Sequence, residues 1–329
     1  MTRIAVLGCG CIARTMAATL RAMRDQGEDV CLYAAASRNI ETAKAFACAE
    51  GFEVAYGSYE EMACDPQVDL VYVASPHSHH AEHMKLCLEH GKAVLCEKSF
   101  TANAKQAREV LALAKEKNLL VAEAIWTRYM PSRRIIDEVI ASGAIGKPVL
   151  LKSSLHYPIT HVPRIMDPAL AGGALLDVGV YPLNFCSMFF GNDFERMETS
   201  VTLTDRGVDL HESFTFHYPD GRMAQLSAGV DCRCDRHCLI SGTEGYLTVD
   251  NVNNPKKITL FRQEDDFANG EDIPVPEQIS GYEYQVRACM KALKDGAIEC
   301  PEMPHSETIR IMEIMDSLRE NWGVRYPFE

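Results

Sequence analysis

Short apolar runs alternate with amphipathic segments along the first third of the chain. Helical spacing of apolar residues follows the first run, from residue 12 onward. The predicted strands cover residues 3–7, 30–36, 54–56, 69–74, 93–96 and 119–124. Further helices are predicted over residues 41–51, 59–64 and 103–118, with another ending after Leu88. This alternation is typical of α/β proteins with a doubly wound parallel sheet.

The remaining chain is rich in strands. Alternating apolar and polar residues predict strands over residues 149–156, 198–204, 208–218, 222–230, 237–241 and 246–250, with a further one at 257–262. Helices are predicted over residues 131–143, 177–190, 281–293 and 306–321. A chain of 329 residues favours two domains. We place them at residues 1–123 and 124–329, and we expect the last helix to pack back on the first domain.

Composition narrows the class of protein. The net charge of −13 argues against a nucleic-acid surface and against an anionic membrane partner. We see no apolar run of eighteen residues and no secretory leader, because the first predicted strand begins at residue 3. The thirteen cysteines are odd in number and scattered through apolar segments. That usage is typical of reduced thiols, so we expect a cytoplasmic protein.

The turn after the first strand carries the sequence Gly8-Cys9-Gly10-Cys11-Ile12-Ala13. A strand, G-x-G-x-x-A and a helix in this order form a dinucleotide-binding pattern. Gly8 permits the tight turn, Gly10 leaves room for a pyrophosphate, and Ala13 allows close packing of helix on sheet. The first residues of the helix, Cys11 and Ile12, would then present free N–H groups to the phosphates. The alternative is a glycine-rich turn without a ligand.

The second strand ends at Ser37-Arg38, where an NAD site would place an acidic residue for the ribose hydroxyls. A hydroxyl and a guanidinium stand there instead. Arginine can hydrogen-bond a 2′-phosphate and stack on adenine. NADP(H) is therefore preferred, NAD(H) stays possible, and the alternative for Arg38 is an ordinary surface side chain.

Histidines follow the fourth strand in Ser75-Pro76-His77-Ser78-His79-His80. Because this loop leaves the carboxyl end of a parallel strand, we expect it to line the nicotinamide end of the cofactor, through Ser75, Pro76, His77 and His80. His79 and His83 are four residues apart and could share a helix face, but no acid or cysteine is spaced to complete a metal site. The spacing C-x-C-x₃-C at residues 232–238 is not a common zinc pattern either. We expect no metal.

Charged and aromatic residues follow the last two strands of the first domain. Glu97-Lys98 ends the fifth strand, and Lys98 is expected to contact substrate or cofactor, with a structural ion pair as the alternative. Trp126 and Arg128 could line the cleft as cofactor contacts and Tyr129 as a substrate contact, although Trp126 could equally be packing between domains.

The long segment 157–173 is expected to shape the substrate pocket, and it contains Arg164. Arg128, His156 and Arg164 could recognise an acidic or phosphorylated substrate. Asp177 and Tyr181 are four residues apart, which places them on one face of the following helix. The alternatives are a helix N-cap for Asp177 and a core position for Tyr181.

Taken in order, these motifs resemble the Gfo/Idh/MocA oxidoreductases, and most closely the branch of dimeric dihydrodiol dehydrogenase and glucose-fructose oxidoreductase. The resemblance runs through GCGCIA, ASR, SPHSHHAEH, AVLCEKS and EAIWTRYMP to GGALLDVGVYP at residues 172–182. The family usually has Glu-Lys-Pro where this chain has Glu97-Lys98-Ser99, and serine lacks the fixed φ of proline. We expect a looser turn there and an intact activity.

The resemblance implies a Rossmann domain followed by an α/β domain with a large, open, mainly antiparallel sheet. It also implies NAD(P)-dependent oxidation or reduction of a sugar, polyol or diol, and a homodimer or tetramer formed through that sheet. It carries over Lys98, Asp177 and Tyr181 as the active-site group.

From these residues we expect Tyr181 to act as general acid/base, because a nearby lysine cation lowers the pKa of a phenol. Lys98 would also donate to the substrate oxygen, Asp177 would hold the substrate hydroxyl or Lys98, and Glu97 would contact the nicotinamide ribose. The alternative function is a nucleotide-binding sensor on the same fold.

Overall fold

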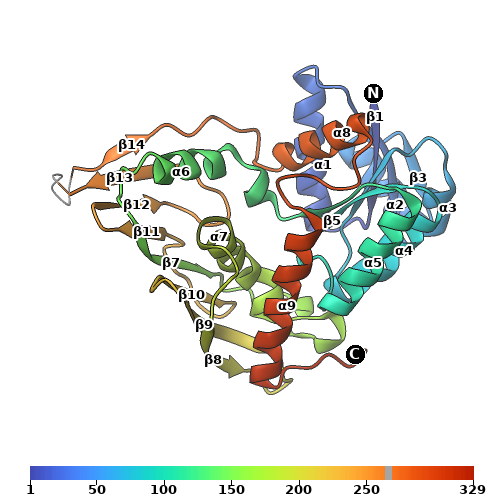
Figure 1. The fold of residues 1–329 in the computed structure, drawn as a ribbon. Coiled ribbons are helices and arrows are strands. Elements are labelled where there is room, and N and C mark those ends of the chain that lie inside the picture. Colours follow the sequence, from blue (N-terminus) through green and yellow to red (C-terminus); the bar gives the residue numbers. More distant parts are fainter. Residues whose placement is uncertain (264–268) are drawn as a thin grey trace. The chain divides into compact units, whose positions relative to one another are not determined.

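The computed structural model describes residues 1–263 and 269–329, which divide into two compact units (Figure 1). The first unit comprises Met1–Trp126 and Gln278–Glu313, and the second comprises Thr127–Glu277 and Ile314–Glu329. The predicted boundary after residue 123 lies three residues before this division. The segment Gln278–Glu313, which we placed in the second domain, belongs to the first unit.

The first unit contains a six-stranded parallel sheet in the order β3-β2-β1-β4-β5-β6. The strand order reverses between β1 and β4, which is where doubly wound sheets bind ligands. The elements of this unit are β1 (Thr2–Leu7), α1 (Cys11–Asp25), β2 (Val30–Ala36), α2 (Ile40–Glu50), β3 (Val54–Tyr56), α3 (Tyr59–Cys64), β4 (Leu70–Val73), α4 (His77–Glu89), β5 (Ala93–Glu97), α5 (Ala104–Lys117), β6 (Val121–Ala124), α8 (Glu283–Asp295) and the first half of α9 (His305–Trp322).

The sequence accounts for these elements directly. All seven residues of β2 are buried, as expected for a strand of a parallel sheet that is covered on both faces. Helix α2 begins at Asn39, whose side chain accepts hydrogen bonds from the backbone of Glu41 and Thr42, and it ends at Gly51 with φ of 81°. The predicted inward face of α1 is confirmed, because its small and apolar residues at spacings of three and four are buried.

The late segment of the first unit packs beside its earliest helix. Helix α8 lies next to α1 (Figure 1). Thr19 and Ser280 share a hydrogen bond of 2.8 Å, and Arg287 pairs with Glu28 at 2.7 Å. The chain therefore returns, after the second unit, to complete the first one.

The second unit is built on an eight-stranded sheet in the order β14-β13-β12-β11-β7-β10-β9-β8. Among the described strands of this sheet, only the β7–β10 pair is parallel, so the predicted large, mainly antiparallel sheet is confirmed. Its elements are η1 (Trp126–Tyr129), α6 (Pro131–Ala141), β7 (Pro148–His156), η2 (Pro163–Met166), η3 (Pro168–Leu170), the π-helix η4 (Leu175–Gly179), α7 (Val180–Phe190), β8 (Arg196–Leu203), β9 (Asp209–His217), β10 (Met223–Gly229), β11 (Cys238–Gly242), β12 (Gly245–Val249), β13 (Ile258–Arg262), β14 (Glu271–Ile273) and the second half of α9.

One face of this sheet is covered by η4 and α7. Residues of β7 and β10 alternate between that buried face and a more exposed face. The segment Pro168–Phe190, 23 residues long, is apolar enough to span a membrane by length and composition, and the sequence reading missed it. Because 89% of its most apolar stretch is buried inside the protein, it has the environment of a core helix.

Candidate functional site

The loops after β1 and β4 approach each other closely at the point where the strand order reverses. Gly8 has φ of +101°, which favours glycine, and a Cβ there would lie 3.0 Å from the carbonyl oxygen of Ala74. Both the backbone angle and the space therefore require glycine at position 8. This places the first turn of α1 beside the loop that carries Ser75 and Pro76.

The N-terminus of α1 has the features of a phosphate cradle. Gly10 is the exposed N-cap residue, no side chain caps the helix, and a Cβ on Gly10 would meet nothing within 4 Å. Helices α2, α3 and α5 are each capped by an asparagine or serine side chain. Cys11 is exposed and Ala13 is fully buried against the sheet. Uncapped N–H groups and open space fit a pyrophosphate.

The two residues that follow β2, Ser37 and Arg38, offer a hydroxyl and a positive charge. Arg38 is exposed, and its guanidinium makes no hydrogen bond or ion pair with any described residue. It lines a hollow of about 550 Å³ that also borders Gly57 and Ser58 and whose lining includes the acidic residues Glu41 and Glu61. The Ser37 hydroxyl accepts a long hydrogen bond of 3.5 Å from the backbone of Asn39.

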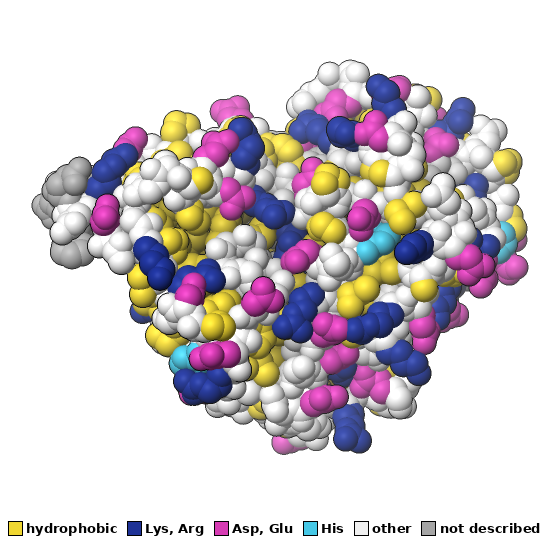
Figure 2. Space-filling view, in the orientation of Figure 1, with side chains coloured by type: hydrophobic (Ala, Val, Ile, Leu, Met, Phe, Trp, Pro, Cys, Tyr) yellow, Lys and Arg dark blue, Asp and Glu magenta, His cyan; other side chains and the backbone are white. Residues whose placement is uncertain are grey.

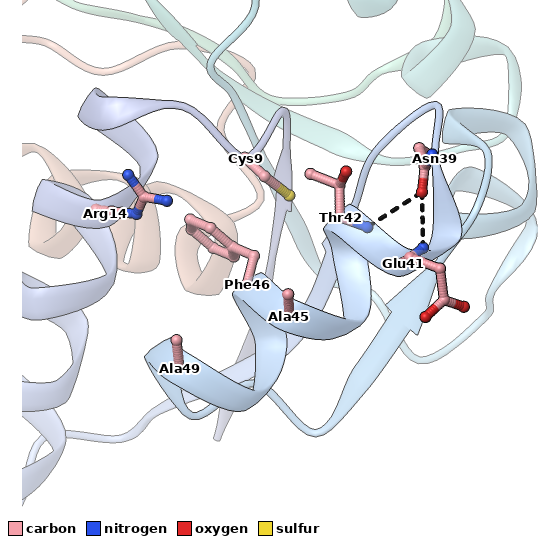
Figure 3. A pocket seen from close by; sticks show the side chains of 8 residues that line it. All are labelled: Cys9, Arg14, Asn39, Glu41, Thr42, Ala45, Phe46 and Ala49. Atoms are coloured by element: carbon pink, nitrogen blue, oxygen red, sulfur yellow. Dashed lines mark hydrogen bonds between the residues drawn. The ribbon is translucent and has the colours of Figure 1, made fainter.

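A second hollow of about 440 Å³ lies between α1 and α2 (Figure 3). Cys9 and Arg14 lie on its α1 side, and Asn39 and Thr42 lie on its α2 side. Sequence reasoning did not single out Arg14. The two hollows meet at the first turn of α2, because both are bordered by Asn39 and Glu41.

His80 links the loops that follow β4 and β5. Its ring is fully buried, with Nε2 2.8 Å from the carbonyl oxygen of Ser75 and Nδ1 2.9 Å from that of Ser99. Burial lowers the pKa of His80 to about 4, against which its backbone hydrogen bonds act. His77 makes a similar contact of 3.2 Å to the carbonyl oxygen of Lys98. These two histidines therefore hold the loop of Lys98 in place.

The metal hypothesis gains no support from the described residues, among which no group of three His, Cys, Asp or Glu side chains could hold an ion. The rings of His79 and His83 stack at 5.7 Å. The thiols of Cys232 and Cys238 contact His156 and Ser153, which lie on opposite faces of β7 because strand residues alternate. Cys234 contacts Ser154, on the same face as His156, so Cys238 lies on the opposite face of β7 from Cys232 and Cys234.

Glu97 and Lys98 end β5 as predicted. Glu97 is 6% exposed, and its carboxylate accepts hydrogen bonds from the hydroxyl of Tyr72 and the backbone N–H of Lys98. The Lys98–Ser99 peptide bond is cis, at the position where the resemblance leads one to expect proline. Lys98 itself is half-buried.

The ring of Trp126 stacks on that of Tyr282, with centroids 4.2 Å apart and an interplanar angle of 6°. Both residues belong to the first unit, and Trp126 is 5% exposed. Tyr282 was missed by sequence reasoning, since a lone tyrosine in a loop carries no signal of its partner. This contact lies within the first unit, so both alternatives for Trp126, a place in the cleft and packing between domains, stay predictions.

Arg128 and Tyr129 are buried in η1, in the second unit. The Arg128 guanidinium donates to the side chains of Asn184 at 2.6 Å and Ser187 at 2.7 Å, both on α7. Its predicted contact with the cofactor stays a prediction. In the structure, the hydrogen bonds of Arg128 join η1 to α7.

Asp177 lies in the middle of the π-helix and is therefore not an N-cap, so that alternative is wrong. Arg164, from η2 in the long segment 157–173, donates a hydrogen bond to Asp177 across 2.8 Å. The Asp177 side chain is 8% exposed and that of Arg164 is 44% exposed. Tyr181 follows in the first turn of α7 and is 6% exposed. Two residues predicted for the substrate pocket are thereby brought together.

Two buried carboxyl groups of β9 underlie this segment, and sequence reasoning missed both. Asp209 accepts from the backbone of Leu175 at 2.5 Å. Glu212 lies where a Cβ on Gly179 would be 2.9 Å from its Oε1, and neither of its oxygens has a hydrogen-bond partner among the described residues. Burial, reinforced by Asp209 and Asp231, raises the pKa of Glu212 well above its usual range. The available signal was acidic residues at inward positions of an alternating strand.

His156 does not join Asp177 and Tyr181. It is paired with Gly229 in the sheet, and its ring lies beside Gly229 and Ser227. The neighbouring Ala228 faces the π-helix, so alternation places His156 on the opposite face of the sheet. The predicted grouping of His156 with the substrate residues is therefore corrected.

Two family models match the chain in the order of its units. "Oxidoreductase family, NAD-binding Rossmann fold" matches residues 2–124, and "GFO/IDH/MocA C-terminal domain" matches residues 134–248. Full-length relatives agree. Trans-1,2-dihydrobenzene-1,2-diol dehydrogenase of Mus musculus is 31% identical over 336 residues, covering 99% of this chain and 98% of the relative. The chain belongs to the Gfo/Idh/MocA family.

Other similar proteins fit this membership. The human trans-1,2-dihydrobenzene-1,2-diol dehydrogenase is 32% identical, with 99% of this chain and 98% of the relative covered. The crystal structure of KijD10, a 3-ketoreductase from Actinomadura kijaniata in complex with NADP and TDP-benzene, has a TM-score of 0.85 at 28% identity, covering 97% of each chain. The chain is thus an NAD(P)-binding oxidoreductase of this family that acts on CH–OH groups.

Proposed function

We propose that this Gfo/Idh/MocA oxidoreductase prefers NADP(H) and transfers hydride to or from a sugar, a polyol or a trans-dihydrodiol. The observation that carries the cofactor preference is the exposed Arg38 guanidinium after β2, which has no hydrogen-bond or ion-pair partner among the described residues and follows Ser37 where an NAD site would place an acidic residue. The diol is suggested by full-length relatives named for a dihydrodiol, and the sugar by a 3-ketoreductase.

The residues present fit a nicotinamide dinucleotide. The open space at Gly10 and the uncapped first turn of α1 would receive the pyrophosphate, and Ser37 with Arg38 would receive the 2′-phosphate. The loop of Ser75 and Pro76 would border the nicotinamide end, where His77, His80 and Glu97 support it. When bound, the cofactor supplies the hydride chemistry, and the protein supplies position and proton control.

The proposed proton chemistry belongs to three side chains. Tyr181 gives a proton to the carbonyl oxygen during reduction and takes it back during oxidation. Lys98 donates a hydrogen bond to the same oxygen and favours the phenolate of Tyr181. Asp177 orients the substrate hydroxyl, and Arg164 supports this role because its guanidinium fixes the carboxylate at 2.8 Å.

The experiment is a fluorescence titration of the purified protein with NADPH and NADH, followed by a panel of aldoses, ketoses and diols observed at the nicotinamide absorbance. We expect tighter binding of NADPH, a reduced preference for NADPH in Arg38→Met, and turnover of at least one substrate. An unchanged NADPH dissociation constant in Arg38→Met would refute the 2′-phosphate assignment. Tight binding without any turnover would favour the sensor.

We further propose a homodimer or tetramer formed through the more exposed face of the eight-stranded sheet, and a cytoplasmic location. All thirteen cysteines are free, which supports a reducing compartment. Figure 2 shows that basic and acidic side chains are intermixed over the described residues in view. The face of the protein drawn there therefore has no continuous basic stripe for nucleic acid. Sedimentation of the purified protein tests the assembly.

A further inference from the structure

Two arginines line hollows that border the first turn of α2, and only one of them was assigned above. Arg38 lines the hollow near Gly57, and Arg14 lines the hollow between α1 and α2. Both hollows include Asn39 and Glu41. The two arginines therefore line adjoining hollows that share these two residues.

Arg14 makes only one weak charged contact within the described residues of the first unit. Its side chain is 62% exposed, and its only ion pair is a distant one of 3.9 Å to Glu50, among the described residues. Glu50 is already paired with Arg21 at 2.6 Å. If the Arg14 side chain moved away from Glu50, that carboxylate would still be paired with Arg21. Arg14 is therefore available to bind an anion.

The position of Arg14 indicates which phosphate of the cofactor, the pyrophosphate or the 2′-phosphate, its side chain could reach. The pyrophosphate belongs at the N–H groups of α1, next to the loop after β4. The hollow of Arg14 contains no residue of that loop and instead contains residues of α2. It therefore lies on the β2 side of the glycine loop, where a doubly wound fold holds the adenosine ribose.

The charges around the hollow suit a phosphate. Residues along α2, from its N-cap Asn39 to Ala49, form one side of the hollow, and Cys9 is the only part of the glycine loop in its lining. Glu41 is the one acidic residue there, but its carboxylate is directed away from Arg14 and Cys9 (Figure 3) and pairs with Lys44 at 3.1 Å. The floor beside Arg14 is apolar, formed by Phe46 and its alanine neighbours, which limits hydration of a bound ion pair.

We propose that Arg14 is a second specificity-determining residue for NADP(H), which binds the 2′-phosphate from the α1 side while Arg38 binds it from the other. This inference rests on the proposed NADP(H) preference. A phosphate dianion between two guanidinium groups keeps one charge-assisted contact when either is lost. Each single substitution should therefore weaken binding in part, and the double substitution should abolish the preference.

The test uses 2′,5′-ADP and 5′-AMP as probes, besides NADPH and NADH, with full-length Arg14→Met, Arg38→Met and the double variant. Arg24→Met is the matched control, because it removes one positive charge from the far end of the same helix. Arg14→Lys keeps the charge without the planar donor pair.

We expect Arg14→Met to raise the dissociation constants of NADPH and 2′,5′-ADP about tenfold, which equals the loss of one charge-assisted hydrogen bond. Binding of NADH and 5′-AMP should stay unchanged, Arg14→Lys should be intermediate, and Arg24→Met should resemble the wild type.

Equal weakening of NADPH and NADH in Arg14→Met, or no change for either, would overturn the role of Arg14. An effect of Arg24→Met as large as that of Arg14→Met would also overturn it, since the cause would be net charge. If Arg38→Met alone abolishes the preference, the 2′-phosphate assignment stands and the Arg14 inference fails. If the wild type binds 2′,5′-ADP no better than 5′-AMP, the proposed cofactor preference itself fails.

Discussion

Arg164 holds Asp177 by a hydrogen-bonded ion pair of 2.8 Å that joins the long segment 157–173 to the π-helix. The two groups differ in exposure, since the Asp177 side chain is almost fully buried and that of Arg164 is nearly half exposed. A buried carboxylate is sensitive to loss of a charged partner.

We predict that Arg164→Met lowers kcat/KM about tenfold, because Asp177 loses the group that orients it. The dissociation constant of NADPH should stay unchanged, since both residues belong to the second unit and the nucleotide is proposed to bind the first. Steady-state kinetics and a nucleotide titration measure the two effects. Arg206→Met, which removes an arginine paired with Asp167 in the same segment, is the control. Equal losses in both variants would contradict a specific role for Arg164.

Tyr181→Phe removes one hydroxyl from a nearly buried ring and should keep the fold. We predict that it lowers kcat by about 10² to 10⁴, the usual contribution of a general acid/base. Lys98→Met should produce a loss of similar size, and the double variant should lose little more, because the two residues act as a unit. Full turnover by Tyr181→Phe on a verified substrate would refute the proton role.

Glu212 gives a stability prediction whose sign depends on pH. Its pKa is raised in the folded protein, so the folded state keeps a proton that the unfolded chain releases above its ordinary pKa near 4.3. Stability from this group is complete below that value and is lost as the pH rises toward the folded pKa. Glu212→Gln, a neutral side chain of the same shape, should therefore stabilise the protein more at pH 8 than at pH 5.

Thermal unfolding of Glu212→Gln and the wild type at the two pH values measures this difference. Glu60→Gln, which replaces an exposed carboxylate on α3, is the control and should shift neither melting temperature. A variant less stable than the wild type at pH 8 would show that the Glu212 carboxyl has a favourable partner and would contradict the prediction.

The lowered pKa of His80 predicts the opposite pH dependence of stability, a loss on acidification. Its pKa is lowered from 6.5 to about 4, so the unfolded chain binds a proton in this range before the folded protein does. Stability is therefore lost as the pH falls from 6.5 toward 4, by about 3 kcal/mol for a shift of this size.

His80→Gln should be less stable than the wild type at pH 7.5, because a fully buried ring with two carbonyl contacts is lost. Its stability should, however, decline less steeply between pH 6.5 and 4. Denaturant unfolding across this range separates the two effects. Parallel pH profiles for variant and wild type would show that His80 does not titrate as proposed.

Local patterns were sufficient for most of the fold. The predicted strand 30–36 is β2 in the structure, and the predicted strand 54–56 is β3, because apolar runs bounded by turn residues define buried parallel strands. The short strand Glu271–Ile273 was not predicted, since its charged and exposed residues lack an apolar run. The π-helix was missed because its spacing differs little from that of an α-helix over five residues.

The site was predicted less completely than the fold. Glycine motifs and strand-end motifs consist of residues that are neighbours in the sequence. The phosphate cradle at Gly10 and the exposed Arg38 could therefore be predicted from the sequence. The pair Arg164–Asp177, the stack Trp126–Tyr282 and the contact of Glu212 with the π-helix depend on residues far apart in the chain. The face of the sheet on which His156 lies depends on whether its position along β7 is odd or even. The sequence did not settle this face, because His156 is the last residue of the strand.

The measurement that tests the account most directly is the initial rate of nicotinamide reduction with trans-1,2-dihydrobenzene-1,2-diol and a panel of sugars and polyols, each with NADP⁺ and with NAD⁺. We predict that at least one substrate is oxidised, with a kcat/KM at least about tenfold higher for NADP⁺, the ratio expected from one charge-assisted contact. We also predict that Tyr181→Phe loses this activity while it still binds NADP⁺. A higher kcat/KM with NAD⁺, or bound NADP⁺ without oxidation of any substrate in the panel, would contradict these predictions.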